Sequence, residues 1–239
     1  MNDPYDLAPD VIAPTLPGRV VLRESTEETL DAAASELFTH AIDCVRTFGD
    51  FHLALSVSTS LEGLFRRLMV DPKFRSLPWN RTHLWLACER VGSEAGECGR
   101  ELRELVVDHS GIPAEQTHII PLDAEEVASS YERDLRETLE WREPGHDRLD
   151  GVVLGLDDPI TGAGPCESES LVVAGDDAVV RLSRRMINAS RLISVVGLGG
   201  GAVEPLREHR SSARPFGLAP IGGALCWYLD HEACGRDSR

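Results

Sequence analysis

The stretch that decides the fold is RLDGVVLGLDDPITGAGPC, residues 148–166. It begins with an apolar run, residues 152–154, that stops at Gly155. A short β-branched run bounded by turn residues predicts a buried strand rather than a helix. Asp157 and Asp158 then open an acidic segment that predicts a loop at the carboxyl end of that strand. Ligands of parallel α/β sheets bind outside such ends, so we expect this loop to carry part of any active site.

Size, charge and cysteine usage narrow the class of protein. The chain has 239 residues and is 42% apolar, which is enough for one large domain with a sizeable core. Its formal net charge of −16 disfavours nucleic acid and anionic lipid as partners. The six cysteines form no C-x-x-C pair, the acidic start differs from a secretory signal, and no apolar run is long enough for a transmembrane helix. We therefore expect a reduced, cytoplasmic protein.

Strand and helix patterns alternate along the chain. Ser25 and Glu28 form a capping box before a long amphipathic helix, and Asp123 and Glu126 suggest a second one. A further helix is predicted around residues 100–107. The predicted strands lie at residues 20–22, 51–57, 83–87, 117–120, 152–154, 178–183, 192–196 and 225–229. This alternation predicts an α/β fold with a mostly parallel sheet and helices on both faces.

The same pattern predicts a single domain. No linker interrupts the alternation, and we place the domain at residues 19–239. Residues 1–18 contain four prolines and little apolar pattern, so they are predicted to form an extended or disordered arm.

Two strand ends carry polar residues suited to a ligand. LSVSTS, residues 55–60, predicts a strand running into a helix, and its amides and hydroxyls form either a phosphate cradle or a plain N-cap at Thr59 or Ser60. Glu89 and Arg90 end another strand, where they either bind a polar ligand or form an exposed ion pair of little energetic value.

Two other patterns argue against common cofactors. GLGGGA, residues 197–202, fits the dinucleotide-binding glycine pattern, but no acid for a ribose follows about twenty residues on. A tight strand-to-helix turn explains it better. The eight histidines show no H-E-x-x-H motif and no paired ligand spacing, so no metal site is expected.

Six motifs, in order, resemble those of the 6-phosphogluconolactonase family, whose fold is shared with glucosamine-6-phosphate and ribose-5-phosphate isomerases. In the first half of the chain, LSVSTS at 55–60 corresponds to the family's L-S-G-G-S-T, Trp79 with CER at 88–90 to its W…D-E-R, and HIIP at 118–121 with YE at 131–132 to its H-P…Y-E. In the second half, LDGVVLGLD at 149–157 corresponds to F-D-L-V-L-L-G-M-G, INASR at 187–191 to L-N-A-A-R, and WYLD at 227–230 to W-x-L-D. The resemblance covers nearly the whole chain and implies the same single-domain fold.

The resemblance also implies a reaction: hydrolysis of 6-phosphoglucono-δ-lactone, in the pentose phosphate pathway, without metal or cofactor. The family's catalytic histidine falls on Thr161, and threonine is no general base near neutral pH. The base would then be Asp157 or Asp158. The ligand-binding residues implied are Ser56, Ser58, Thr59, Glu89, Arg90 and Arg181.

Several substitutions weaken the family's site. Ser56 and Val57 replace the phosphate-loop glycines, and Cys88 replaces the acid of D-E-R. Two hypotheses therefore stand. The chain is a divergent hydrolase of a phosphorylated sugar lactone or related sugar phosphate, or it is a catalytically inactive relative that binds a sugar phosphate or a protein partner.

Overall fold

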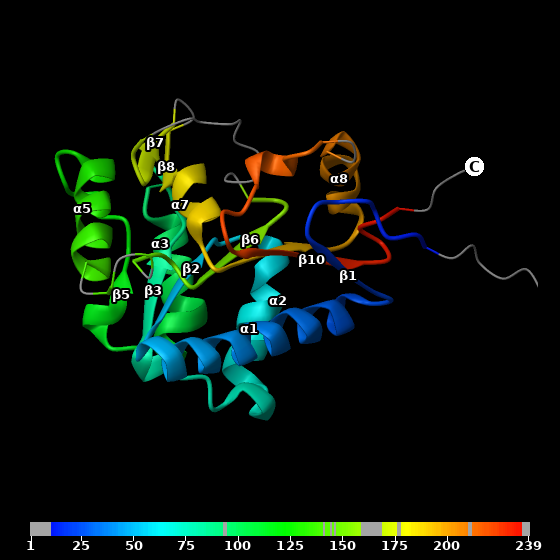
Figure 1. The fold of residues 1–239 in the computed structure, drawn as a ribbon, viewed down its shortest axis with the longest axis horizontal. Coiled ribbons are helices and arrows are strands. Elements are labelled where there is room, and N and C mark those ends of the chain that lie inside the picture. The colour runs from blue at the N-terminus through cyan, green and yellow to red at the C-terminus, as the bar shows by residue number, and fades with distance from the viewer. Residues whose placement is uncertain are drawn as a thin grey trace, which may run out of the picture.

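A seven-stranded parallel sheet forms the centre of the protein (Figure 1). The computed structural model describes residues 11–92, 95–140, 142–143, 145, 147–158, 169–175, 178–209 and 212–235. The strand order is β1-β10-β9-β6-β2-β3-β5, and every neighbouring pair is parallel. The strands are β1 (Arg19–Arg23), β2 (Phe51–Leu55), β3 (Thr82–Leu86), β5 (Thr117–His118), β6 (Gly151–Gly155), β9 (Leu192–Gly197) and β10 (Ala224–Asp230).

The middle of this sheet is formed by the most apolar runs of the sequence. All residues of β2, β6 and β9 are buried, as expected for strands covered on both faces. Val152 and Leu154 are 0% exposed, which confirms the strand predicted in the stretch 148–166. The α/β architecture with a mostly parallel sheet is therefore confirmed.

Helices cover both faces of the sheet. In Figure 1, α1 runs below the sheet, whereas α7 and α8 lie above it. Ser25 caps α1 by accepting a hydrogen bond from the Glu28 amide, and Gly49 ends the helix in the left-handed conformation. The helices are α1 (Thr26–Phe48), α2 (Thr59–Val70), α3 (Glu97–Leu102), α4 (Asp108–Ser110), α5 (Val127–Leu139), α7 (Arg184–Ala189) and α8 (Val203–His209).

A second, three-stranded antiparallel sheet was not predicted. Its order is β4-β8-β7, with β4 at Cys88–Arg90, β7 at Val172–Ala174 and β8 at Val179–Leu182. Only β8 was expected as a strand, because β4 and β7 are too short to show periodicity. Its strand β7 follows residues 159–168, which lie outside the described residues.

One predicted helix start is wrong, and one predicted helix is longer than expected. Glu126, not Asp123, is the N-cap of α5, and its side chain makes no capping hydrogen bond. The helix expected at residues 100–107 begins earlier, at Glu97, and continues as a π-helical turn from Arg103 to Val107. Spacing alone could not separate these arrangements.

The described part of the N-terminal arm packs on the core. Leu16 is buried, and the Trp227 indole N–H donates to the Pro17 carbonyl over 2.8 Å. Gly18 has a φ of +89°, and a Cβ there would lie 2.4 Å from the Leu225 carbonyl oxygen, so only glycine fits. Among the described residues, no helix is both long and apolar enough to cross a bilayer.

Candidate active site

Three strand ends bring the candidate site together at one edge of the large sheet. Leu55 of β2 pairs with Val153 of β6, and Gly155 pairs with Val196 of β9. Because the strands are parallel, the segments that leave them emerge side by side. These segments are LSVSTS, the acidic loop and the glycine-rich turn, which the sequence had suggested separately.

The Asp157 carboxylate lies on the first turn of α2. It accepts hydrogen bonds from the Ser60 amide over 3.2 Å and from the Ser60 hydroxyl over 2.5 Å. Ser58 Oγ lies 3.1 Å from Ser60 Oγ, which extends this polar chain. A Cβ at Gly155 would lie only 2.1 Å from Ser58 Oγ and 2.6 Å from both Asp157 Oδ1 and Ser60 Oγ. Only a glycine therefore fits next to these three side chains.

A cleft of about 370 Å³ opens beside this cluster. Its polar lining comes from Thr26, Thr59, Ser60 and Asp157. The remaining lining residues are Leu156, Gly197, Leu198, Gly199, Gly201 and Ala202. A Cβ at Gly199 or Gly201 would meet no atom within 4 Å, so this wall leaves room for a ligand.

Asp230 fixes the glycine-rich wall, a role that sequence analysis missed. Its buried carboxylate accepts from the Gly199 amide at 3.0 and 3.1 Å, from the Thr26 hydroxyl at 2.7 Å and from the Ala233 amide at 2.7 Å. Gly199 has a φ of +66°, which a glycine adopts without strain. The WYLD motif was the available signal, and its aspartate joins three segments of the chain.

Asp158, the second candidate base, does not line the cleft. It is 2% exposed and lies 3.6 Å from Cys88 Sγ. Burial and the nearby Arg181 charge lower the pKa of Arg184 to about 10, while Asp158 opposes that shift. Asp158 therefore belongs to a charged cluster between the two sheets, with Arg181 and the unpredicted Arg184.

The other implied ligand-binding residues are spread over several places. Ser56 is buried and accepts from the Gly155 amide, so it links β2 to β6. Glu89 is 0% exposed and accepts from the amides of Cys98 and Gly99 at the start of α3. Arg90 is exposed at the end of β4 and does not line the cleft. Thr161 lies outside the described residues.

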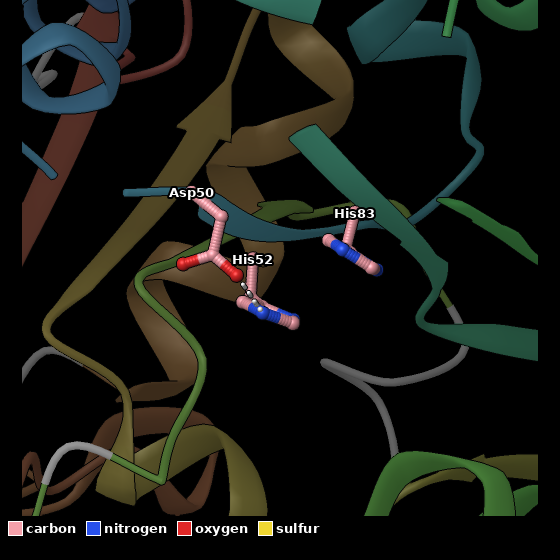
Figure 2. A group of neighbouring side chains, drawn as sticks. All are labelled: Asp50, His52 and His83. Carbon is pink, nitrogen blue, oxygen red and sulfur yellow. Dashed lines mark hydrogen bonds and ion pairs between the residues drawn. The ribbon is translucent and has the colours of Figure 1, made fainter. Parts of the chain in front are cut away.

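A second cluster of ionisable residues lies at the opposite edge of the sheet (Figure 2). Asp50 precedes β2, His52 lies near its start, and His83 lies near the start of β3. The two imidazole rings stack with centroids 4.5 Å apart and an angle of 11° between their planes. Together, the three side chains offer ligand atoms within 4.8 Å of one another.

This cluster does not fit a metal ion. Imidazole lone pairs lie in the ring plane, so two stacked rings cannot both direct one at a shared ion. The Trp85 indole, which is only a donor, donates to His52 Nδ1 over 3.2 Å. His52 Nε2 must then carry the proton and donate it to Asp50 Oδ2 over 2.9 Å. Both nitrogens of His52 are therefore engaged in holding β2, β3 and the Asp50 turn together.

The histidine stack continues to α5. The His118 ring lies 3.6 Å from Trp85 between centroids, and its Nδ1 donates to Asp134 over 2.9 Å. His83 Nδ1 lies within hydrogen-bond distance of His118 Nε2, at 3.1 Å. Burial, with the neighbouring His52 and His118, lowers the pKa of His83 to about 4. His83 is thus neutral near pH 7, and we assign the stack a structural role.

The sequence of the chain matches the model of a known protein family. Residues 24–158, more than half of the chain, match the sequence model of the family described as Glucosamine-6-phosphate isomerases/6-phosphogluconolactonase. The chain belongs to this family. The match contains both LSVSTS and the strand that ends at Asp157.

Curated relatives of the family are similar over most of the chain. The human GDH/6PGL endoplasmic bifunctional protein is 26% identical over 236 residues, which cover 87% of this chain. This chain spans only 29% of the length of that protein. The 6-phosphogluconolactonase of Aggregatibacter actinomycetemcomitans is 25% identical over 76% of this chain and 85% of its own length.

Solved structures of the family have the same fold. The 6-phosphogluconolactonase from Thermotoga maritima superposes with a TM-score of 0.72 at 18% identity, covering 89% of this chain and 99% of that one. The 6-phosphogluconolactonase from Trypanosoma cruzi gives a TM-score of 0.71 at 16% identity, covering 94% and 98%. At these identities the similarity establishes the fold alone.

Proposed function

We propose that the chain hydrolyses the lactone ring of a sugar acid in the cleft at the end of β6. The observation that carries the proposal is the exposed Asp157 carboxylate, held in that cleft by Ser60. Relatives named 6-phosphogluconolactonase make a lactone the substrate class to consider. 6-Phosphoglucono-δ-lactone and its unphosphorylated counterpart are both substrates to test.

The lining of the cleft suits such a ring. The hydroxyl groups of the sugar lactone can form hydrogen bonds with Thr26, Thr59 and Ser60, and Leu156 and Leu198 can contact its ring carbons. The bare backbone of the glycine-rich wall lets a ring approach closely. The cleft therefore combines a few polar groups with an apolar wall, as small-molecule sites commonly do.

Asp157 is assigned as the general base. Each of its carboxylate oxygens uses one lone pair on Ser60 and keeps another for a water molecule. The base takes a proton from water as the water oxygen bonds to the lactone carbonyl carbon. The ring C–O bond then breaks, and the leaving oxygen takes up that proton, so that an open-chain sugar acid is released. No oxidant, reductant or cofactor is needed for this balance.

The assignment favours Asp157 over Asp158 because only Asp157 lines the cleft. Lactone hydrolysis is followed as acid release at constant pH, with the spontaneous rate subtracted. Asp157→Asn is expected to lose about 10²–10⁴-fold in rate, the usual contribution of a general base. Asp108→Asn is the matched control, because Asp108 is an exposed acid outside the cleft. Full turnover in Asp157→Asn would refute the base assignment.

A second candidate is a relative that binds without turnover. The observation in its favour is that no histidine lines the cleft among the described residues. Absence of turnover in the wild type, together with a thermal shift caused by a sugar acid or its phosphate, would favour this candidate. If the wild type shows neither turnover nor a thermal shift, both candidates are refuted, hydrolysis and binding without turnover.

Domain limits and location are proposed on sequence grounds. We keep residues 19–239 as the proposed domain, with Leu16 and Pro17 packed on it. Limited proteolysis tests this limit: the stable fragment should contain the proposed domain together with Leu16 and Pro17, because these two residues are packed on it. The proposed cytoplasmic location is tested by cell fractionation.

A further inference from the structure

The N-terminus of α2 already holds an anion supplied by the chain itself. α2 has 12 residues, and its N-cap residue, Ser58, makes no side-chain capping hydrogen bond. The Asp157 carboxylate takes that place by accepting from both the amide and the hydroxyl of Ser60. A residue 97 positions further along the chain thus caps the helix.

This contact uses the feature that would otherwise attract a ligand phosphate. The first amides of a helix lack partners within the helix, and its dipole places roughly half a positive charge there. Such an end binds phosphates and also carboxylates. With Asp157 on Ser60, a phosphate approaching α2 meets a fixed negative charge in place of free donors.

Compensation of that charge would need a basic side chain on the lining of the cleft. No lysine, arginine or histidine is among its lining residues in the part of the chain that the structure describes. Arg181 lies with Asp158 and Arg184 instead, and the whole chain carries a formal charge of −16. The field in the cleft therefore opposes an anionic ligand.

We propose that the cleft selects an uncharged, hydroxylated lactone and that Asp157 excludes a phosphate group from α2. This inference names the substrate class of the proposed hydrolase and therefore rests on the proposed function. A neutral lactone is not repelled by the Asp157 charge, and its hydroxyl groups can still form hydrogen bonds with Thr26 and Thr59. A phosphate adds almost two negative charges within a few ångströms of that carboxylate.

A binding experiment tests the exclusion without relying on catalysis. Inorganic phosphate and 6-phosphogluconate are titrated calorimetrically into the wild type, Asp157→Asn and Asp157→Ser. Asp157→Asn removes only the charge, whereas Asp157→Ser also vacates the position on Ser60. We expect both variants to bind phosphate about 10-fold or more tightly than the wild type. Asp108→Asn, with the same loss of charge elsewhere, should bind as the wild type does.

A kinetic experiment on the wild type tests the substrate class. The kcat/KM for glucono-δ-lactone is expected to exceed that for its 6-phosphate by about 10-fold or more. Equal rates, or a preference for the phosphorylated lactone, would overturn the inference and leave the proposed hydrolysis intact. If neither lactone is hydrolysed, the proposed function fails, and the calorimetry alone decides whether Asp157 excludes phosphate. Equal phosphate affinity in the wild type and both variants would overturn that exclusion.

Discussion

The replacement Asp150→Asn tests how the strand that carries the candidate site is anchored. Asp150 is 0% exposed and directly precedes β6. Its carboxylate accepts from the His52 amide at 2.8 Å, from Arg142 at 2.8 and 3.1 Å, and from Arg191 at 3.1 Å. Arg142 also binds Asp50 over 2.5 Å. Every partner of Asp150 in this cluster is a donor.

The isosteric asparagine cannot satisfy these donors. Its amide group turns an N–H pair toward a guanidinium or the His52 amide, and Arg142 loses one of its two buried counter-ions. Breaking a buried ion pair by removing one partner costs about 3–5 kcal/mol. A domain of this kind is stable by about 5–15 kcal/mol, so the loss is a large share of the total. Urea unfolding followed by circular dichroism should show a lower midpoint with an unchanged slope.

An exposed pair provides the control for this measurement. Arg46 and Asp43 form an ion pair on α1 with side chains 76% and 53% exposed. Asp43→Asn should cost less than about 1 kcal/mol. A loss below about 1 kcal/mol in Asp150→Asn would contradict the argument that these buried charges hold β6. In that case the double variant Asp150→Asn/Arg142→Met would show no coupling energy between the two sites.

Three further predictions concern the site and the histidine stack. Gly155→Ala places a Cβ 2.1 Å from Ser58 Oγ, so it should lower stability by about 1–3 kcal/mol in urea unfolding and abolish ligand-induced thermal shifts. Asp230→Asn weakens the hold on Gly199 and should cost about 1–3 kcal/mol, read as a lower urea midpoint. The pKa of His83 is about 4 when folded, against 6.5 for an ordinary histidine, because burial and the neighbouring histidines disfavour its charged form. As the pH falls, the unfolded chain therefore binds the proton first, and stability is lost between about pH 6.5 and about pH 4. The melting temperature of His83→Gln should fall less than that of the wild type over this range. An equal fall in both proteins would contradict the prediction.

Most of the large sheet could be predicted from local sequence. The runs that became β2, β6 and β9 are short, apolar and bounded by turn residues, and burial on both faces demands that composition. The Ser25 cap and the Gly49 end of α1 are also local signals, and both were confirmed. The family resemblance was right for the same reason, because its motifs sit at strand ends.

The arrangement of the site depended on contacts that local patterns do not contain. Asp157 and Asp158 are equivalent in the sequence, yet one caps α2 and the other is buried beside Cys88. The contact of Asp158 is with the short strand β4, whose pairing with β8 has no periodic signal. The role of Glu89 at the start of α3 likewise depends on a chain reversal of nine residues.

The two ends of β6 carry acids under opposite conditions, and this contrast supports placing the proposed site at the carboxyl end. At the amino end, Asp150 is fully buried and held by two arginines and a backbone amide, so exchanging these partners for a ligand would leave charges unpaired in the core. At the carboxyl end, Asp157 is exposed and held by a single serine. Each of its carboxylate oxygens keeps a lone pair for water or a ligand hydroxyl while it stays on Ser60. The buried end therefore fixes the strand, and the exposed end is the one that suits the proposed site.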